Sequence, residues 1–158
     1  MVKLELYIDT SVFGFLFEDK FSDKMRTTED FFKVVKVKNF SLYISELVLL
    51  EINRIPDKNL KDKIIKVIED FKPYVLEYNH DIEKLANEII RMKVIPEKFI
   101  DDARHIGYAI FYEMDGIVSW NMKHIVKFST KKIVEAICVL YNYKKIEILT
   151  PEEVIYEK

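Results

Sequence analysis

The segment KLELYIDTS, residues 3–11, carries the clearest structural pattern near the beginning of the chain. Polar and apolar residues alternate at first and then give way to apolar residues, which predicts a β-strand over 3–8. Asp9, Thr10 and Ser11 follow as a turn that can cap a short helix over 12–17. A strand that leads through an acidic turn into a helix is therefore the first unit of the predicted fold.

The same alternation of short apolar runs and helical patterns continues along the chain. Further strands are predicted over 41–44, 74–76, 116–119 and 146–149. Helices are predicted over 23–37, 45–53, 59–71, 81–92, 97–112 and 133–140, and Thr150-Pro151-Glu152-Glu153 is a strong helix start. Strands that alternate with helices indicate an α/β sandwich around a mainly parallel central sheet of about five strands. No repeat or linker interrupts the pattern, so we expect a single domain over 1–158.

The composition of the chain excludes several classes of protein. Among 158 residues, 49% are hydrophobic and 13% aromatic, enough for a sizeable core and too many for a disordered chain. The apolar runs are shorter than the roughly 20 residues of a membrane span, and the N-terminus lacks the pattern of a signal peptide. Cys138 is the single cysteine, which excludes an intrachain disulfide and a multi-cysteine zinc site and is compatible with the reducing cytoplasm. The net charge of −2 argues against bulk attraction to nucleic acid but allows a local basic patch.

Polar residues cluster where the predicted strands end, which is where active sites of parallel sheets lie. They are Asp9, Glu46, Glu51, Asp101, Asp102, Ser119 and Asn121. A cluster of carboxylates is costly unless a cation neutralises it, and hard oxygen ligands suit Mg²⁺ or Mn²⁺. Such an ion can turn water into a nucleophile and stabilise charge on phosphate oxygens. The pattern therefore indicates a metal site for phosphate chemistry.

Several of these acids also have a structural interpretation. Asp9 can serve as a helix cap, and acids in a first helical turn, such as Glu46, Asp101 and Asp102, are favoured by the helix dipole. Glu51 is more informative because it interrupts the apolar run LVLLEI over 47–52, where a buried carboxylate needs a partner. Arg54, three residues further on, is the structural candidate for that partner.

The histidines and lysines near these acids allow two interpretations each. His105 and His124 are either packed or surface side chains, or ligands of the site, and neither belongs to a His-x-x-x-His zinc motif. The most basic segment contains Lys123, Lys127, Lys131, Lys132, Lys144 and Lys145. These lysines form either a solvated helix face or a landing surface for a phosphate backbone beside the acidic site.

Segments spread over essentially the whole chain resemble the PIN domain, the fold of VapC-like ribonuclease toxins. They are YIDTS (7–11), ISELVLLEI (44–52), DDARHIGYA (101–109), IVSWNMKHI (117–125) and TPEE (150–153). Each segment alone is only weakly specific for the PIN domain. The segments together are fairly specific for it, because they occur in the expected order and each follows the expected element. The resemblance implies a three-layer α/β/α fold, a Mg²⁺ or Mn²⁺ site and endoribonuclease activity.

The resemblance also implies roles for individual residues. The catalytic acids of the family fall on Asp9, Glu51 and Asp102, which would hold the metal ion, and its fourth polar ligand falls on Asn121. Thr10 and Ser119 would position the substrate, while Glu46, Asp101, His105 and His124 are secondary candidates. Many family members have an aspartate at the position of Asn121 or of His124. Asparagine is a neutral oxygen donor, so the site here would be less negative and would bind a second ion more weakly.

The function that follows from the resemblance is a metal-dependent endoribonuclease that acts on RNA. The resemblance further implies a toxin with a cognate antitoxin protein, and a homodimer. The alternative is a catalytically weak or inactive PIN-like domain that binds RNA or protein. A receiver domain would need an acidic pair after the first strand. A haloacid-dehalogenase-type phosphatase would need the motif Asp-x-Asp at that place, and a dinucleotide-binding fold would need a glycine-rich first turn. The segment YIDTS satisfies none of these.

Overall fold

The computed structural model describes residues 3–18 and 22–156 of the chain, so the predicted domain over 1–158 extends beyond the described residues. The strands are β1 (Glu5–Ile8), β2 (Ser41–Ser45), β3 (Tyr74–Leu76), β4 (Gly116–Val118) and β5 (Glu147–Leu149). The helices are α1 (Thr10–Phe15), α2 (Asp23–Lys38), α3 (Glu46–Asn53), α4 (Lys58–Phe71), α5 (His80–Arg91), α6 (Ile100–Phe111), α7 (Phe128–Leu140) and α8 (Pro151–Ile155), with a 3-10 turn η1 (Glu97–Phe99) before α6. Among these helices none is long and apolar enough to cross a membrane.

The strands form one five-stranded sheet with the order β3-β2-β1-β4-β5, and every pair in the described sheet is parallel. The predicted α/β class and mainly parallel sheet are therefore confirmed. β1 lies at the centre, where Leu6, Tyr7 and Ile8 are fully buried. This burial explains why the alternating pattern of 3–11 turns apolar, since a central parallel strand is covered on both faces.

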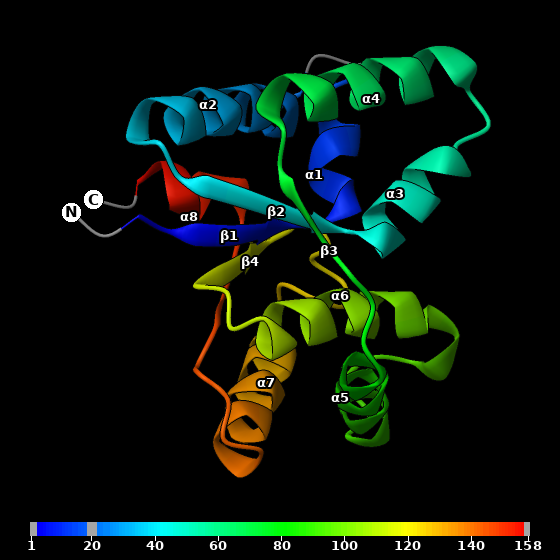
Figure 1. Cartoon of the computed structure of the whole chain (residues 1–158), viewed down its shortest axis with the longest axis vertical. Helices are drawn as coiled ribbons and strands as arrows, with labels where there is room; N and C mark the ends of the chain where they lie inside the picture. The colour runs from blue at the N-terminus through cyan, green and yellow to red at the C-terminus, as the bar shows by residue number, and fades with distance from the viewer. Residues whose placement is uncertain (1–2, 19–21, 157–158) are drawn as a thin grey trace.

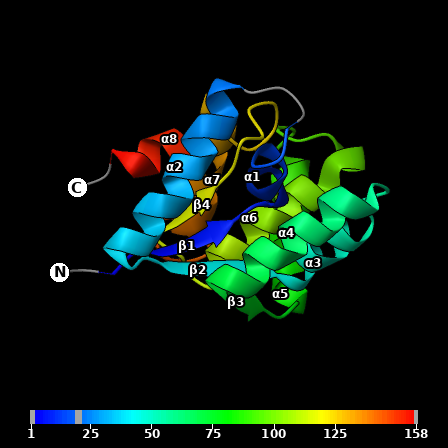
Figure 2. The same ribbon diagram turned by 90° about the horizontal axis from the view of Figure 1, so that it is seen from above.

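Helices cover both faces of the sheet and make three layers (Figure 1). One layer contains α1, α2, α4 and α8, and the other contains α5, α6 and α7. Viewed from above, α2 and α8 lie side by side in front of the sheet (Figure 2), and they pack against each other. On the opposite face, α5 packs along α6. The predicted three-layer arrangement is thus present.

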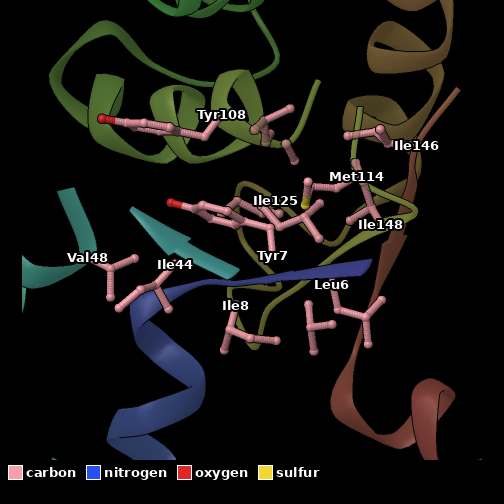
Figure 3. Packing of buried hydrophobic residues seen from close by; sticks show 14 of the residues in the cluster. Leu6, Tyr7, Ile8, Ile44, Val48, Tyr108, Met114, Ile125, Ile146 and Ile148 are labelled. Carbon is pink, nitrogen blue, oxygen red and sulfur yellow. The ribbon is translucent and has the colours of Figure 1, made fainter. Parts of the chain in front are cut away.

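The side chains of β1 divide between the two layers (Figure 3). Leu6 and Ile8 point to one side of the strand, while Tyr7 points to the other, toward α6. The Tyr7 ring stacks on that of Tyr108, with centroids 6.1 Å apart and an interplanar angle of 12°. The strand thereby presents a buried hydroxyl group to the helix that carries Asp102 and His105.

Most element boundaries follow local rules, and the deviations have physical reasons. Ser45 caps α3 by accepting a hydrogen bond from the Val48 N–H, and Thr150 with Glu153 forms a capping box at α8, both as predicted. The predicted helix over 97–112 is divided into η1 and α6. The predicted segment 133–140 lies on α7, which begins earlier, at Phe128. The sequence did not indicate the first turn of α7, because this turn lacks both an apolar stripe and a side-chain cap.

Candidate active site

The end of β1 and the helices α3 and α6 bring together two carboxylates and an imidazole. Asp9 directly follows β1, Glu51 lies on α3 behind β2, and His105 lies on α6. Among the described residues, ligand atoms of these three side chains lie within 4.8 Å of one another. We name this group the acidic site.

The carboxylate of Asp9 is buried and held by serine hydroxyl groups. Its Oδ2 accepts hydrogen bonds from the Oγ of Ser11 and of Ser119, each at 2.7 Å. Its Oδ1 lies 3.5 Å from the Nε2 of His105. Asp9 occupies the N-cap position of α1, but its side chain makes no capping hydrogen bond. The structural interpretation as a side-chain cap therefore does not account for Asp9.

Glu51 interacts with other parts of the site rather than with its own helix. Its Oε1 accepts a hydrogen bond from Thr10 Oγ1 at 2.7 Å and bonds to the Nε2 of His105 at 2.5 Å. In the part of the chain that the structure describes, the ion pair of Glu51 is with His105 and not with Arg54. Burial alone would raise the pKa of Glu51, but the hydrogen bonds from His105 and Thr10 outweigh it and lower that pKa. Glu51 is thus held as a carboxylate.

His105 connects the acidic site to the core beneath it. The ring is 1% exposed, and its Nδ1 lies 2.7 Å from the hydroxyl oxygen of Tyr7, which in turn lies 2.7 Å from Ser45 Oγ. Burial alone would lower the pKa of His105. The negative charge of Asp9 and the hydrogen bond to Glu51 raise that pKa by more than burial lowers it, so the net shift is upward. The neighbouring carboxylates thus favour the protonated form of this imidazole.

Tyr7 and Ser45 were not among the predicted site residues. Burial raises the pKa of Tyr7 well above its ordinary value, so its hydroxyl keeps its proton. A tyrosine in an otherwise apolar central strand was the available signal, because a buried hydroxyl group requires a hydrogen-bond partner.

Asp102 belongs to a second group of side chains beside the first. Its Oδ2 lies 2.8 Å from the Nδ1 of His124, and the Asn121 side chain also hydrogen-bonds to it. Burial and the nearby charge of Asp9 raise the pKa of Asp102, and the hydrogen bonds from His124 and Asn121 offset this only in part. The coupling to Asp9 indicates that Asp102 borders the acidic site.

The remaining predicted polar residues of this edge hold the site together. Ser119 is fully buried, and its Oγ accepts a hydrogen bond from the Asn121 N–H at 2.9 Å while it donates to Asp9. The Asn121 Oδ1 accepts the backbone N–H of His124, also at 2.9 Å, which closes the turn after β4. Thr10 and Ser119 thus contact carboxylates of the site, and their role toward a substrate remains a prediction.

Glu46 and Asp101 lie outside this cluster. The Asp101 carboxylate pairs with Arg104 at 2.7 Å, and Arg104 also forms a two-pronged pair with Glu83. Glu46 is exposed in the first turn of α3. Both residues line a groove of about 470 Å³, together with Leu47, Leu50, Arg54, Tyr78, Arg104 and Tyr108. The groove runs between α3 and α6, the helices that carry Glu51 and His105.

The structure separates the basic segment into parts. Lys123 and Lys127 lie in the turn after β4, next to Asn121. Lys144 pairs with Asp115 at 2.7 Å and Lys145 with Glu147 at 3.8 Å, where β4 and β5 begin. Lys123 and Lys127 are therefore the lysines of this segment that lie nearest in sequence to Asn121.

The donor set of the acidic site fits a divalent cation. Two carboxylates and an imidazole nitrogen, buried or half-buried and close together, supply the charge and the ligand atoms that such an ion requires. The serine and threonine hydroxyl groups that hold the carboxylates are the outer partners typical of metal sites.

The protein belongs to the class of α/β sandwiches that have a parallel sheet and acidic residues at its carboxyl end. Solved structures show which fold of this class it has. No family model and no curated protein matches the sequence. The structure is similar to that of VapBC2 from Rickettsia felis bound to a DNA fragment from their promoter, with a TM-score of 0.58, 13% identity, and coverage of 93% of this chain and 98% of that chain. It is also similar to VapC20 from Mycobacterium tuberculosis, a sarcin–ricin loop cleaving toxin, with a TM-score of 0.51, 16% identity and coverage of 71% and 86%. The fold is that of the VapC-like PIN domain.

Proposed function

We propose that the protein is a metal-dependent endoribonuclease that hydrolyses RNA phosphodiester bonds and is the toxin of a toxin–antitoxin pair. The observation that carries this proposal is the acidic site, in which ligand atoms of Asp9, Glu51 and His105 lie within 4.8 Å of one another beside Asp102. The PIN-domain fold supports it, since both structural neighbours come from VapC systems.

Each side chain of the site has a proposed task. Asp9, Glu51 and Asp102 hold Mg²⁺ or Mn²⁺, which when bound activates water and stabilises charge on the phosphate. Ser11 and Ser119 hold Oδ2 of Asp9 by hydrogen bonds, while Oδ1 faces His105. In the second group, His124 and Asn121 orient the Asp102 carboxylate.

Thr10 and Ser119 also stand as proposed substrate-positioning residues, acting through the carboxylates that they hold. The RNA backbone is proposed to approach past Lys123 and Lys127, which neighbour Asn121 in the turn after β4. These lysines supply the positive charge that a strongly acidic site requires nearby if it is to bind a polyanion.

The proposed partners are an RNA substrate, a cognate antitoxin protein and a second copy of the chain, and the proposed location is the cytoplasm. The antitoxin is supported by the VapBC2 complex. The homodimer is supported by exposed apolar residues on α7, where Phe128, Val139 and Leu140 are 70–79% exposed.

The proposal is tested by incubating the purified protein with a panel of RNAs in Mg²⁺, Mn²⁺ or EDTA. The panel includes a sarcin–ricin loop RNA, because one structural neighbour is a toxin that cleaves this loop. We expect metal-dependent cleavage that Asp9→Asn and Asp102→Asn abolish. Asp101→Asn is the matched control, since the adjacent Asp101 pairs with Arg104 outside the acidic site. Cleavage that persists in Asp9→Asn, or equal loss in Asp101→Asn and Asp102→Asn, would refute the site assignment.

A second candidate function is an RNA- or protein-binding module of low catalytic activity. It is favoured by Asn121, whose Oδ1 accepts the His124 N–H and is thus already engaged in the turn after β4. RNA binding without cleavage at any metal concentration, by a folded protein, would support this function over the nuclease.

A further inference from the structure

We propose that the Nε2 atom of His105 is a ligand of the divalent ion, and that this nitrogen makes the site prefer Mn²⁺ to Mg²⁺. The inference rests on the metal site of the proposed function and deepens it by identifying a nitrogen donor and its consequence for the choice of ion.

The position of Nε2 between the two carboxylates is the first argument. It lies 2.5 Å from Oε1 of Glu51 and 3.5 Å from Oδ1 of Asp9. Neighbouring ligand atoms around an octahedral ion at about 2.1 Å are about 3 Å apart, which lies between these two distances. Small side-chain movements therefore suffice for all three atoms to bind one ion.

The hydrogen bonds behind the ring are the second argument. A metal-binding histidine normally donates its other ring N–H to a fixed partner, which sets the tautomer and the ring orientation. Here Nδ1 lies 2.7 Å from the Tyr7 hydroxyl, and this hydroxyl lies 2.7 Å from Ser45 Oγ. In the structure Nε2–H donates to Oε1 of Glu51, and this proton passes to solvent when the ion binds. With Nδ1–H donating to Tyr7 and Tyr7 donating to Ser45, the lone pair of Nε2 then faces the ion. The Ser45 Oγ remains an acceptor for the Val48 N–H throughout.

Rigidity of this support is the third argument. Tyr7 and Ser45 are fully buried, and the Tyr7 ring stacks on Tyr108 of α6. Such packing limits rotation of the tyrosine and holds its hydroxyl under His105. A ligand that is positioned before the ion arrives binds at a lower conformational cost.

The other histidines lack this arrangement. The Nδ1 of His124 is bonded to Asp102, and its ring packs on Phe99 with centroids 4.4 Å apart. His80 is exposed at the beginning of α5. The sequence contains exactly these histidines, so each can be replaced in turn.

The nitrogen donor determines which ion the site favours. Mg²⁺ prefers oxygen ligands in a near-ideal octahedron, whereas imidazole is a common ligand of first-row transition ions. An all-carboxylate site would discriminate little between Mg²⁺ and Mn²⁺. A site that includes His105 is expected to bind Mn²⁺ more tightly.

The experiment is electron paramagnetic resonance of Mn²⁺ bound to the purified full-length protein, without RNA. We expect pulsed spectra of the wild type to show hyperfine coupling to a histidine nitrogen. His105→Gln removes the coupling and weakens Mn²⁺ binding by more than the roughly 10- to 100-fold that is typical for loss of an outer partner of a ligand. His80→Gln and His124→Gln retain the coupling. Competition with Mg²⁺ displaces Mn²⁺ from His105→Gln at a lower Mg²⁺-to-Mn²⁺ ratio than from the wild type.

Tyr7→Phe is a second variant that keeps the imidazole and removes the partner of Nδ1. It is expected to retain the nitrogen coupling while losing about 10- to 100-fold in Mn²⁺ affinity. Circular dichroism checks that both variants are folded, and the wild-type spectrum tests the ligand even if a variant unfolds.

The outcomes separate this inference from the proposed function. Mn²⁺ that binds in an Asp9-dependent way but shows no nitrogen coupling overturns the His105 assignment and leaves a carboxylate metal site. Coupling that survives in folded His105→Gln, or that disappears in His124→Gln, overturns the assignment in the same way. A wild-type protein that binds no Mn²⁺ in an Asp9-dependent way overturns both.

Discussion

Gly107 determines how closely α5 and α6 approach each other. A Cβ atom at this position would lie 2.9 Å from the backbone oxygen of Ile82 and 3.2 Å from its Cγ2. Because the first contact is with backbone, we expect Gly107→Ala to lower the free energy of unfolding by about 1–3 kcal/mol, as measured by urea denaturation.

Gly14→Ala is the matched control for Gly107→Ala, since a Cβ on Gly14 of α1 meets no non-neighbouring heavy atom of the described chain within 4 Å. It is expected to be neutral or to stabilise by up to about 1 kcal/mol, because alanine favours a helix over glycine. Equal destabilisation by both substitutions would contradict the close approach of α5 and α6.

Ser45 has two tasks that a second serine of the chain helps to separate. It caps α3 and also hydrogen-bonds the buried Tyr7 hydroxyl, whereas the less buried Ser22 caps α2 through the Met25 N–H. Loss of a cap costs about 1 kcal/mol, and a weakened buried hydrogen bond adds about 1–3 kcal/mol. Thermal unfolding should therefore show a larger loss of stability for Ser45→Ala than for Ser22→Ala. The reverse order would mean that Tyr7 does not depend on Ser45.

At this scale the sequence allowed some site residues to be recognised better than others. Asp9 and Glu51 were recognisable as a carboxylate after a strand and a carboxylate in an apolar helix. The partner of Glu51 was not, because Arg54 is near in sequence while His105 comes into reach only through packing of α6. For Tyr7, the buried hydroxyl in an apolar strand signalled that a hydrogen-bond partner exists, but the identity of that partner, His105, depends on the same packing.

Among the elements, α7 carries an apolar surface that suits a second copy of itself. Phe128, Val139 and Leu140 are 75%, 79% and 70% exposed, and Ala136 lies among them with Lys132 and Glu135. In an antiparallel pair related by a two-fold axis midway between Lys132 and Glu135, Lys132 of one copy would face Glu135 of the other. This surface is therefore self-complementary in charge as well as apolar.

We expect the protein to be dimeric in light scattering and Val139→Glu to be monomeric, because a buried glutamate would lack a partner. Val37→Glu is the matched control, since Val37 is 85% exposed on α2. A Val139→Glu protein that remains dimeric would exclude the α7 surface as the interface.

Element boundaries were predictable where a cap or a clear period marks them. The start of α3 at Glu46 and that of α8 at Pro151 follow from Ser45 and Thr150. The first turn of α7 was missed because Lys127 offers no side-chain cap and the turn carries no apolar stripe. The split between η1 and α6 was also not indicated by the sequence, since both segments have helical patterns.

For the molecule as a whole, Asp115 links segments that lie far apart in sequence. Its Oδ2 accepts the Glu5 N–H at 2.8 Å, and its Oδ1 accepts a hydrogen bond from Lys144 Nζ at 2.7 Å. Burial raises the pKa of Asp115, but the hydrogen bonds from Lys144 and Glu5 outweigh it and lower that pKa. The carboxylate thus favours the folded state above its unfolded-state pKa, and this contribution is lost as the pH falls through the folded-state pKa.

We expect Asp115→Asn to be less stable than the wild type by about 1 kcal/mol at neutral pH and to show a smaller loss of stability in acid. Chemical denaturation from neutral to acidic pH measures both effects. Parallel pH profiles for the two proteins would contradict this role of Asp115.

The central place of β1 in the sheet has a consequence for synthesis on the ribosome. Strand β1 is made well before its neighbour β4, and Ser119, which holds Asp9, lies 110 residues further along the chain. A nascent chain therefore carries the first acid of the site long before Ser119 and Asn121 exist to complete it. Folding of the sheet must wait for these distant strands. The site is thus complete only after the segment that contains Ser119 and Asn121 has been made, and a product interrupted before this segment lacks the complete site.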